Sequence, residues 1–445
     1  METEILVVGG NVAGRGFVSS ILKINPQTQI TLVRRENKAL VPCGIPYIFG
    51  TLKLPDNNAV SDESMVEKGV NILVDEVTAI DKERKLAVTA SGEKIIYNKL
   101  VLATGSLPVV PGIGEGGNFN NIYFIFKDLD YLTLLKNYLK EKKKVVIVGG
   151  GFIGVELAEE LSKLIDGSIT IVECGPTCLW QSFDLEFAQM VEKILCEIGI
   201  KIYKLETVKK FIGHKGNVKQ IELTGGGKLD VDAVIFAAGV YPNTTLGKAI
   251  GLPLDKFGAI KVDKYMRADK DIYAIGDCAS KQDYFTGEPV SVMLGSIAAT
   301  EAKIAAHNLY NLTGMFRNGT LSIVLTSLNG ISFGSVGLTE GNARVRGFNT
   351  KIGSVQVYDR HPACLPGAVK QIVKLVFDKE TGVILGGQAC GGQSVGELVN
   401  IIGLAVQTRM TASQILALQM GTHPLMTPGP TMYTITNAAE NSLVK

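Results

Sequence analysis

The 445-residue sequence lacks the features that would place it in several common classes of protein. Its 45 Lys and Arg nearly balance its 43 Asp and Glu, so no net field favours nucleic acid or an anionic membrane surface. It has no run of about 18 apolar residues, the length that a membrane-spanning helix requires, and it opens without the basic start and apolar core of a secretory signal. We therefore expect a cytoplasmic protein that binds neither nucleic acid nor membrane.

Paired cysteine spacing is missing as well. The seven cysteines lie at positions 43, 174, 178, 196, 278, 364 and 390, without the C-x-x-C pairs that are typical of zinc sites. This pattern argues against both a metal centre and a disulfide framework. It directs attention to a single reactive thiol.

Glycine, in contrast, is abundant: the chain has 50 glycines, above the usual share of about 7%. Two similar glycine-rich turns follow short apolar strands, Gly9-Gly10-Asn11-Val12-Ala13-Gly14 and Gly149-Gly150-Gly151-Phe152-Ile153-Gly154. In such a turn the first glycine permits the bend, the second lets backbone N–H groups approach a pyrophosphate, and the third lets helix and strand pack closely. Two copies at domain-scale spacing predict two dinucleotide-binding folds.

An acidic residue distinguishes the second turn from the first. Glu173 ends the next apolar run, 19 residues after Gly154. A carboxylate there accepts hydrogen bonds from an adenosine ribose and repels a 2′-phosphate, so NADH is predicted in preference to NADPH. The first copy departs from the pattern, with Asn11 at the middle glycine position and Arg34 where an acid is expected. Glu36 is the nearest acid.

Further small-residue turns follow apolar strands downstream. They are Ala103-Thr104-Gly105, the turn that ends at Gly239, and Gly276-Asp277, which carries a carboxylate. Ligands of open α/β sheets bind at the carboxyl ends of strands, so these turns are candidate binding positions. Past about residue 320 the pattern changes to alternating strands followed by an apolar helix, which predicts a separate α+β domain.

Taken in order, these motifs resemble the flavoprotein disulfide reductases with two dinucleotide-binding folds, over nearly the whole chain. The resemblance implies an α/β protein with FAD in the first fold, NAD in the second, and a C-terminal domain that forms a homodimer. It implies an FAD-binding domain of residues 1–115 and 240–318, an NAD-binding domain of residues 116–239 and a dimerisation domain of residues 319–445. In such relatives Thr104 and Gly105 lie by the adenine half of FAD, Asp277 holds its ribityl or phosphate region, and Phe152 covers the flavin. Pro42, Ile153 and Glu156 complete the cofactor-binding candidates.

The segment around Cys43 narrows the resemblance. Only one cysteine stands in Val41-Pro42-Cys43-Gly44-Ile45-Pro46, where lipoamide and glutathione reductases carry two. The chain is thus similar to the single-cysteine branch, which includes coenzyme A disulfide reductases, NADH oxidases and peroxidases, and persulfide reductases. A cysteine just before a helix start gains from the positive end of the helix, so we expect a stabilised thiolate that attacks sulfur substrates.

Three other residues bear on the reaction. In the members of this branch that reduce peroxide or oxygen, the first glycine turn carries a histidine. The similar position in this chain is Val12, so the resemblance favours sulfur substrates over peroxide and oxygen. Cys364 stands where coenzyme A disulfide reductases have a tyrosine, and His423 resembles the acid/base histidine of two-cysteine reductases. Both are predicted to approach Cys43 of the other subunit in the dimer, where the imidazole would protonate a leaving thiolate.

The leading interpretation is an NADH-dependent flavoprotein that reduces small disulfides, persulfides or polysulfides through Cys43. An NADH oxidase, which passes electrons from the flavin to oxygen, is the first alternative. A reductase or redox-sensing partner of a small carrier protein is the second.

Overall fold

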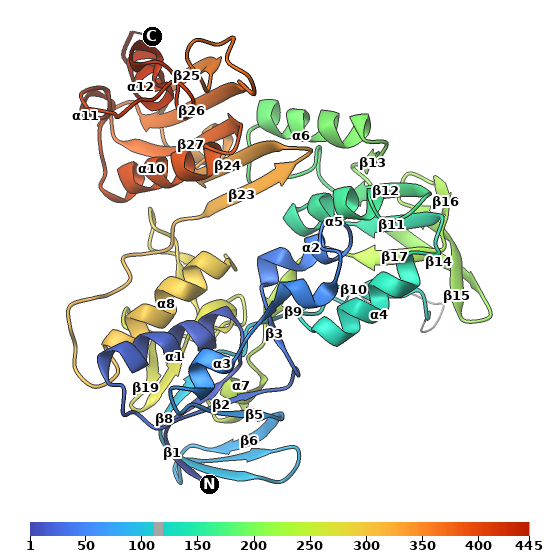
Figure 1. Cartoon of the computed structure of the whole chain (residues 1–445), viewed down its shortest axis with the longest axis vertical. Coiled ribbons are helices and arrows are strands. Elements are labelled where there is room, and N and C mark those ends of the chain that lie inside the picture. Colours follow the sequence, from blue (N-terminus) through green and yellow to red (C-terminus); the bar gives the residue numbers. More distant parts are fainter. Residues whose placement is uncertain (111–118, 445) are drawn as a thin grey trace.

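The computed structural model describes residues 1–110 and 119–444, and it has three units (Figure 1). The predicted division between residues 115 and 116 lies outside this range. The division at 239 and 240 falls between strands β17 and β18, and the one at 318 and 319 falls between helix α8 and strand β23. The mixed α/β class is confirmed.

The first unit is a sheet in the order β19-β20-β8-β1-β2-β5, to which β6 and β7 are added. The strands are β1 (Glu2–Val8), β2 (Ile30–Arg34), β5 (Asn71–Val74), β6 (Val77–Asp81), β7 (Leu86–Thr89), β8 (Lys94–Leu102), β19 (Arg267–Asp269) and β20 (Ile272–Ala274). From β20 to β5 all neighbours are parallel. Since β20 pairs with β8 across a long insertion, the sheet is built from two separate stretches of chain.

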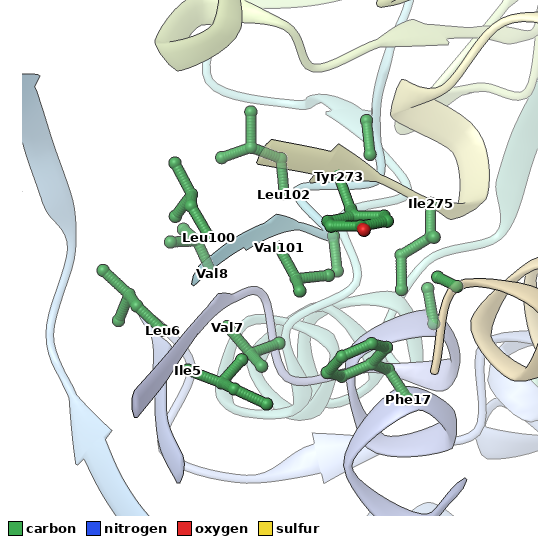
Figure 2. Packing of buried hydrophobic residues seen from close by; sticks show 14 of the residues in the cluster. Ile5, Leu6, Val7, Val8, Phe17, Leu100, Val101, Leu102, Tyr273 and Ile275 are labelled. Carbon is green, nitrogen blue, oxygen red and sulfur yellow. The ribbon is translucent and has the colours of Figure 1, made fainter. Parts of the chain in front are cut away.

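Helices α1 (Val12–Ile24) and α8 (Gly295–His307) pack against each other beside this sheet. The strands are apolar on both faces, as expected for a covered parallel sheet. Ile5, Leu6 and Val7 of β1 are fully buried. Figure 2 shows them with side chains from β8, with Phe17 of α1 and with Tyr273 of β20. The core therefore fixes the carboxyl ends of β1, β8 and β20 near one another.

The second unit is a parallel sheet in the order β10-β17-β11-β12-β13, drawn in green and teal in Figure 1. Its strands are β10 (Ile122–Phe124), β11 (Lys144–Val148), β12 (Ser168–Glu173), β13 (Lys201–Lys204) and β17 (Ala233–Phe236), and its helices are α4 (Leu129–Leu139), α5 (Phe152–Ser162) and α6 (Leu185–Glu197). A small antiparallel sheet of β14 (Val208–His214), β15 (Asn217–Leu223) and β16 (Lys228–Asp230) is attached. The unit repeats the strand, glycine turn and helix of the first.

The third unit, orange and red in Figure 1, is an antiparallel sheet in the order β23-β24-β27-β26-β25 with helices packed on it. Its elements are β23 (Ile323–Leu328), β24 (Ile331–Gly337), α9 (Glu340–Val345), β25 (Thr350–Tyr358), β26 (Lys370–Asp378), β27 (Ile384–Gly391), α10 (Val395–Gln407), α11 (Ala412–Leu416) and α12 (Thr434–Val444). This is the predicted α+β unit.

Further short elements lie between these strands and helices. They are β3 (Ala39–Leu40), α2 (Ile45–Ile48), β4 (Ala59–Val60), α3 (Glu63–Val66), β9 (Ser106–Pro108), β18 (Val240–Pro242), α7 (Thr245–Ala249), β21 (Lys281–Gln282) and β22 (Pro289–Val290). Among residues 1–110 and 119–444, every helix is too short or too polar to cross a bilayer.

Candidate functional site

Cys43 lies on a single 3₁₀ turn, Pro42–Gly44, that leads into α2. The buried residue Asn58 stabilises this turn through two hydrogen bonds. The Asn58 side-chain amide donates to Val41 O at 3.0 Å, and Val41 N donates to Asn58 O at 3.0 Å. The Cys43 residue itself is exposed. The chain therefore presents one thiol from a braced turn.

The surroundings of this thiol differ from the predicted helix-stabilised thiolate. Burial of the sulfur's environment raises the pKa of Cys43, and the Glu156 and Asp277 carboxylates raise it further, while the Lys127 ammonium lowers it. The net shift of the Cys43 pKa is thus opposite to the one expected from the start of α2. A four-residue helix aligns few peptide dipoles, and two carboxylates oppose it.

The start of a longer helix also faces Cys43. A methyl group built on Gly295, the first residue of α8, would stand 3.6 Å from the Cys43 Sγ. α8 has 13 residues and no acid in its first turn. Its positive end is thus available to a negative charge beside the thiol.

Glu156 of α5 is a partly buried carboxyl close to this thiol. Burial raises the pKa of Glu156 to about 7, against the lowering effect of its hydrogen bond from Thr326, and the charges of Glu159 and Glu160 add to the rise. The Thr326 Oγ1 donates to Glu156 Oε1 at 2.7 Å from the third unit. A group that gains and loses a proton near neutral pH therefore lies within the charge field of Cys43.

α5 also ties the Cys43 segment to the other two units through carboxylates. Glu160 accepts from Thr51 N at 2.6 Å and from Thr51 Oγ1 at 2.9 Å, just beyond α2. Glu159 accepts from Asn329 N at 3.1 Å, in the turn between β23 and β24. Lys163 pairs with both carboxylates. The helix that follows the second glycine turn thus fixes the position of the thiol.

The first glycine turn has the predicted close packing. Gly9 has φ +115°, and side chains built on Gly9 and Gly14 would overlap the Ala103 carbonyl and the Gly9 carbonyl. Asn11, the departure from the pattern, has a role that the sequence did not reveal: its Oδ1 accepts from Leu40 N at 3.3 Å, on the strand that leads to Cys43. Gly276 packs on the same turn, because a methyl group there would stand 2.9 Å from the Ala13 Cβ.

Arg34 and Glu36, the two candidates after β2, have partners within the protein. The Arg34 guanidinium pairs with Asp62 at 2.5 and 2.8 Å, and it donates to the carbonyls of Glu36 and Asn37 at 2.9 Å. Arg34 is buried, and its aliphatic chain lies against Gly10. The basic residue at an acidic position is therefore neutralised by Asp62, which no local motif identified.

Asp277 belongs to a second cluster of charges. Its Oδ2 accepts from Lys127 Nζ at 2.9 Å and from Ser106 Oγ at 2.7 Å. Burial raises the pKa of Asp277, but Lys127 and Ser106 lower it more, so it lies below its ordinary value. Glu301 of α8 accepts from Gly276 N at 2.8 Å and fixes the turn. Lys127 and Glu301 lie outside every motif and were missed.

The two turns predicted beside the cofactors leave open space. Gly105 and Gly239 have φ +70° and +104°, and within the part of the chain that the structure describes no atom lies within 4 Å of a side chain built on either. Thr104 Oγ1 donates to Asn243 O at 2.5 Å, which joins the two stretches of the first unit. Space and left-handed backbone together leave both turns accessible to a ligand.

The second glycine turn repeats the first and binds its own acid. A side chain on Gly154 would overlap the Gly149 carbonyl, whereas one on Gly151 would meet nothing within 4 Å. Glu173 is buried and accepts from Gly150 N at 2.6 Å. The Phe152 ring lies with its centroid 6.3 Å from that of Phe183. The neighbouring Ile153 is exposed.

Both helix starts suit a pyrophosphate. α1 and α5 begin without a side-chain cap and without an acid in the first turn, so their leading N–H groups have no anionic partner among residues 1–110 and 119–444. The strained glycines and the open space at Gly151 give backbone access. The residues present therefore fit one dinucleotide at each turn.

Cys364 and His423 are both exposed, on two loops of the third unit. The loops touch each other: His361 N donates to Pro424 O at 3.1 Å, and His361 Nδ1 lies 2.9 Å from Thr427 O. The structure thus brings the two loops together. Their approach to Cys43 concerns a second subunit and stays a prediction.

Comparison with known proteins agrees with this arrangement. Residues 3–302 match the family described as pyridine nucleotide-disulphide oxidoreductase, and residues 325–432 match the dimerisation domain of the same family. Among curated proteins, an NADH oxidase of Methanocaldococcus jannaschii is 32% identical, with 92% of each chain covered. An NAD(P)H coenzyme A polysulfide/persulfide reductase of Pyrococcus horikoshii is 29% identical, with 88% of each chain covered.

Solved structures of similar shape include an NAD-dependent persulfide reductase from A. fulgidus, with TM-score 0.91 and 27% identity over 100% of this chain and 83% of that one. A water-forming NADH oxidase from Lactobacillus brevis has TM-score 0.90 and 26% identity over 99% and 98%. The predictions of the fold and of FAD and a pyridine nucleotide as cofactors are confirmed. The chain belongs to the pyridine nucleotide-disulphide oxidoreductase family, and it is an FAD-dependent NAD(P)H oxidoreductase with that family's dimerisation domain.

Proposed function

We propose that this chain is a cytoplasmic homodimer that uses NADH to reduce small persulfides, polysulfides or disulfides at Cys43. The observation that carries the proposal is the exposed Cys43 thiol on its braced turn, close to the start of α8 and to the near-neutral carboxyl of Glu156. A relative named as a coenzyme A polysulfide/persulfide reductase and a neighbouring structure named as a persulfide reductase support it.

The two glycine turns divide the cofactors in this proposal. FAD would be held at the first by Gly9, Thr104, Gly105 and Asp277, and NADH would be held at the second by Gly151 and Glu173. The flavin, when bound, accepts a hydride from NADH and supplies two electrons to sulfur. Lys127 balances the charge of Asp277 at 2.9 Å and also faces the thiol.

The chemistry at Cys43 begins when the thiol loses its proton, since the thiolate is the nucleophile. Its sulfur forms a bond to one sulfur of the substrate, the S–S bond of the substrate breaks, and the other half leaves as a thiolate that takes up a proton. Two electrons and a second proton then release the part bound to Cys43 as a thiol. One NADH and one proton are used for each S–S bond reduced.

Glu156 is suited to take up and return the proton of Cys43, because its pKa of about 7 leaves both forms populated near neutral pH. His423 and Cys364 of a second subunit are the other candidates for this step, as the sequence predicted. In that case the active site is shared across the dimer.

Oxygen reduction is the second candidate function. Several curated relatives at 30% identity or more, among them those from M. jannaschii and Enterococcus faecalis, are named NADH oxidases. Reduction of oxygen needs the flavin but no sulfur substrate. This chain has Val12 at the position where the similar oxygen-reducing proteins have a histidine. This difference favours a sulfur substrate over oxygen.

Anaerobic NADH consumption with coenzyme A persulfide, polysulfide and coenzyme A disulfide, set against aerobic consumption with oxygen alone, tests the proposal. Replacement of Cys43 by Ser should lower the rate of sulfur-dependent turnover at least 100-fold, because the nucleophile is lost. The rate of flavin reduction by NADH should be unchanged. Cys196→Ser, at another exposed free thiol in α6, is the matched control and should retain turnover. Sulfur-dependent turnover in Cys43→Ser, or turnover with oxygen alone, would contradict the proposal.

A further inference from the structure

Trp180, the chain's one tryptophan, lies beside the carboxylate that ends β12. Its indole Nε1 donates to Glu173 Oε1 at 3.2 Å. The Trp180 residue is 42% exposed, whereas Glu173 is only 5% exposed. A side chain on Gly175 would overlap the indole, so the ring lies directly against the backbone of that residue. An exposed aromatic ring thus covers a buried carboxylate at the carboxyl end of a parallel strand.

The loop holds this ring in place. Leu179, next to Trp180, is buried and has φ +57°, a conformation that costs a branched residue energy unless its surroundings impose it. Leu179 N donates to Gly150 O of the second glycine turn at 2.9 Å, and Phe183 N donates to Leu179 O at 3.1 Å. The position of the indole is therefore coupled to the glycine turn.

The hydrogen bonds of Glu173 show what else it can bind. Oε1 accepts from Gly175 N at 2.5 Å, from Trp180 and from the Cys174 thiol at 3.4 Å, and Oε2 accepts from Gly150 N at 2.6 Å. Each carboxylate oxygen has about two acceptor positions, so Oε1 is fully used and one position remains on Oε2. It can receive a hydroxyl donor but not a phosphate, which is an anion and an acceptor at neutral pH.

The nearest cation by strand register is already paired. Lys204 of β13 stands opposite Glu173 in the parallel ladder. Its ammonium binds Glu192 of α6 at 3.0 Å instead. A phosphate beside Glu173 would thus meet a carboxylate and an aromatic wall, without a free lysine at that position.

We propose that Trp180 determines nucleotide specificity at the second glycine turn: its N–H fixes Glu173 toward a ribose hydroxyl, and its ring forms the outer wall of an adenosine-ribose site that excludes a 2′-phosphate. The inference rests on the proposed use of NADH and names the residue that enforces it. Trp180 acts through Glu173, so it is a positioning residue.

The test uses the FAD-loaded protein with ADP-ribose and 2′-phospho-ADP-ribose, which lack nicotinamide and do not react. Binding is measured by calorimetry and by the fluorescence of the single tryptophan. ADP-ribose should change the Trp180 emission, and 2′-phospho-ADP-ribose should bind at least about 100-fold more weakly, as expected when a charge is forced against an unneutralised carboxylate.

Trp180→Phe keeps a ring but removes the N–H donor. It should weaken ADP-ribose binding and raise KM for NADH about tenfold, the size of a lost hydrogen bond to a charged group, with kcat unchanged because chemistry is remote. The preference against the 2′-phosphate should fall. Phe257→Leu, at another aromatic residue that is 42% exposed, is the matched control and should leave these values unchanged.

Glu192→Gln gives an independent test that leaves Trp180 in place. It frees the Lys204 ammonium, so 2′-phospho-ADP-ribose should bind severalfold more tightly while ADP-ribose binding stays constant. The inference is overturned if ADP-ribose binds without any change in Trp180 emission, or if Trp180→Phe and Glu192→Gln both keep the wild-type preference. A chain that does not bind ADP-ribose at all would overturn the proposed function as well, which separates the two failures.

Discussion

Protonation of the Cys43 thiol is controlled by individual neighbouring residues of opposite sign. Burial and the carboxylates of Glu156 and Asp277 favour the neutral thiol, and the Lys127 ammonium favours the thiolate. Because Lys127 also binds Asp277, a change at either one alters the field at the sulfur. The reactivity of the Cys43 thiol therefore depends on its own burial and on the charges of Glu156, Asp277 and Lys127.

Replacement of Glu156 by Gln should lower the pKa of Cys43, because it removes a negative charge that raises it. Replacement of Lys127 by Met should raise it, because it removes the opposing positive charge. Alkylation of the Cys43 peptide by iodoacetamide, followed by mass spectrometry between pH 6 and pH 10, measures the midpoint. Glu222→Gln, at a carboxyl of the β14–β16 sheet that pairs with Lys209, should not move it. Shifts of the same sign for Glu156→Gln and Lys127→Met would refute this account.

At the scale of elements, the two glycines of α5's first turn have different tasks. Gly154 lies so close to the Gly149 carbonyl that only glycine fits, whereas Gly151 faces open space with φ −74°, which any residue adopts. The former serves the packing of α5 on β11. The latter leaves room for a pyrophosphate.

Gly154→Ala should destabilise the chain by about 1–3 kcal/mol or more, since the added methyl has no space. Gly151→Ala should change stability by less than about 1 kcal/mol yet weaken NADH binding at least tenfold, since its methyl occupies the space left for the ligand. Thermal unfolding and NADH titration of both variants separate the two effects. Normal NADH affinity in folded Gly151→Ala would show that the pyrophosphate does not approach there.

The elements that the sequence predicts well are those whose signal is local. An apolar strand, a glycine turn and a helix are contiguous, so both dinucleotide folds and the turn at Asp277 could be located from spacing alone. The partners of these residues could not, because Asn11 with Leu40 and Arg34 with Asp62 meet only after folding. The thiol's raised pKa was missed for the same reason.

At the scale of the whole molecule, one buried lysine joins the second and third units. The Lys374 Nζ of β26 binds Asp184 at 2.9 Å, Glu186 at 2.5 Å and Glu340 at 2.8 Å. Burial lowers the pKa of Lys374, but the three carboxylates raise it well above its ordinary value. Burial raises the pKa of Asp184, but Lys374 and further hydrogen bonds lower it more, so it lies below its ordinary value.

These directions fix the pH window of the contact. The depressed pKa of Asp184 means that its contribution is present above its ordinary pKa of 3.8 and is lost as pH falls. The raised pKa of Lys374 means that its contribution is present below 10.5 and is lost as pH rises above it. The contact is thus complete at neutral pH.

Lys374→Met should lower stability at pH 7 by about 3–5 kcal/mol, because it leaves the partly buried Asp184 carboxylate without its cation. The difference from wild type should shrink as pH falls toward 3, because protonation of Asp184 in the variant removes its uncompensated charge. Lys193→Met, which breaks the exposed pair with Glu197, should cost at most about 0.5 kcal/mol. Denaturant unfolding at pH 3, 5 and 7 measures the difference in the free energy of unfolding between each variant and wild type. A constant difference across that range would contradict the assignment.

The division of the first sheet into two stretches has a consequence for the newly made protein. On the ribosome, Cys43 emerges long before Asp277 and before Gly295 of α8, while the contiguous second sheet is synthesised in between. At about 5–20 residues per second, that interval lasts on the order of ten seconds or more. During this time the nascent thiol is without the charges and the helix start that later govern it, so its reactivity is acquired only when synthesis has passed α8.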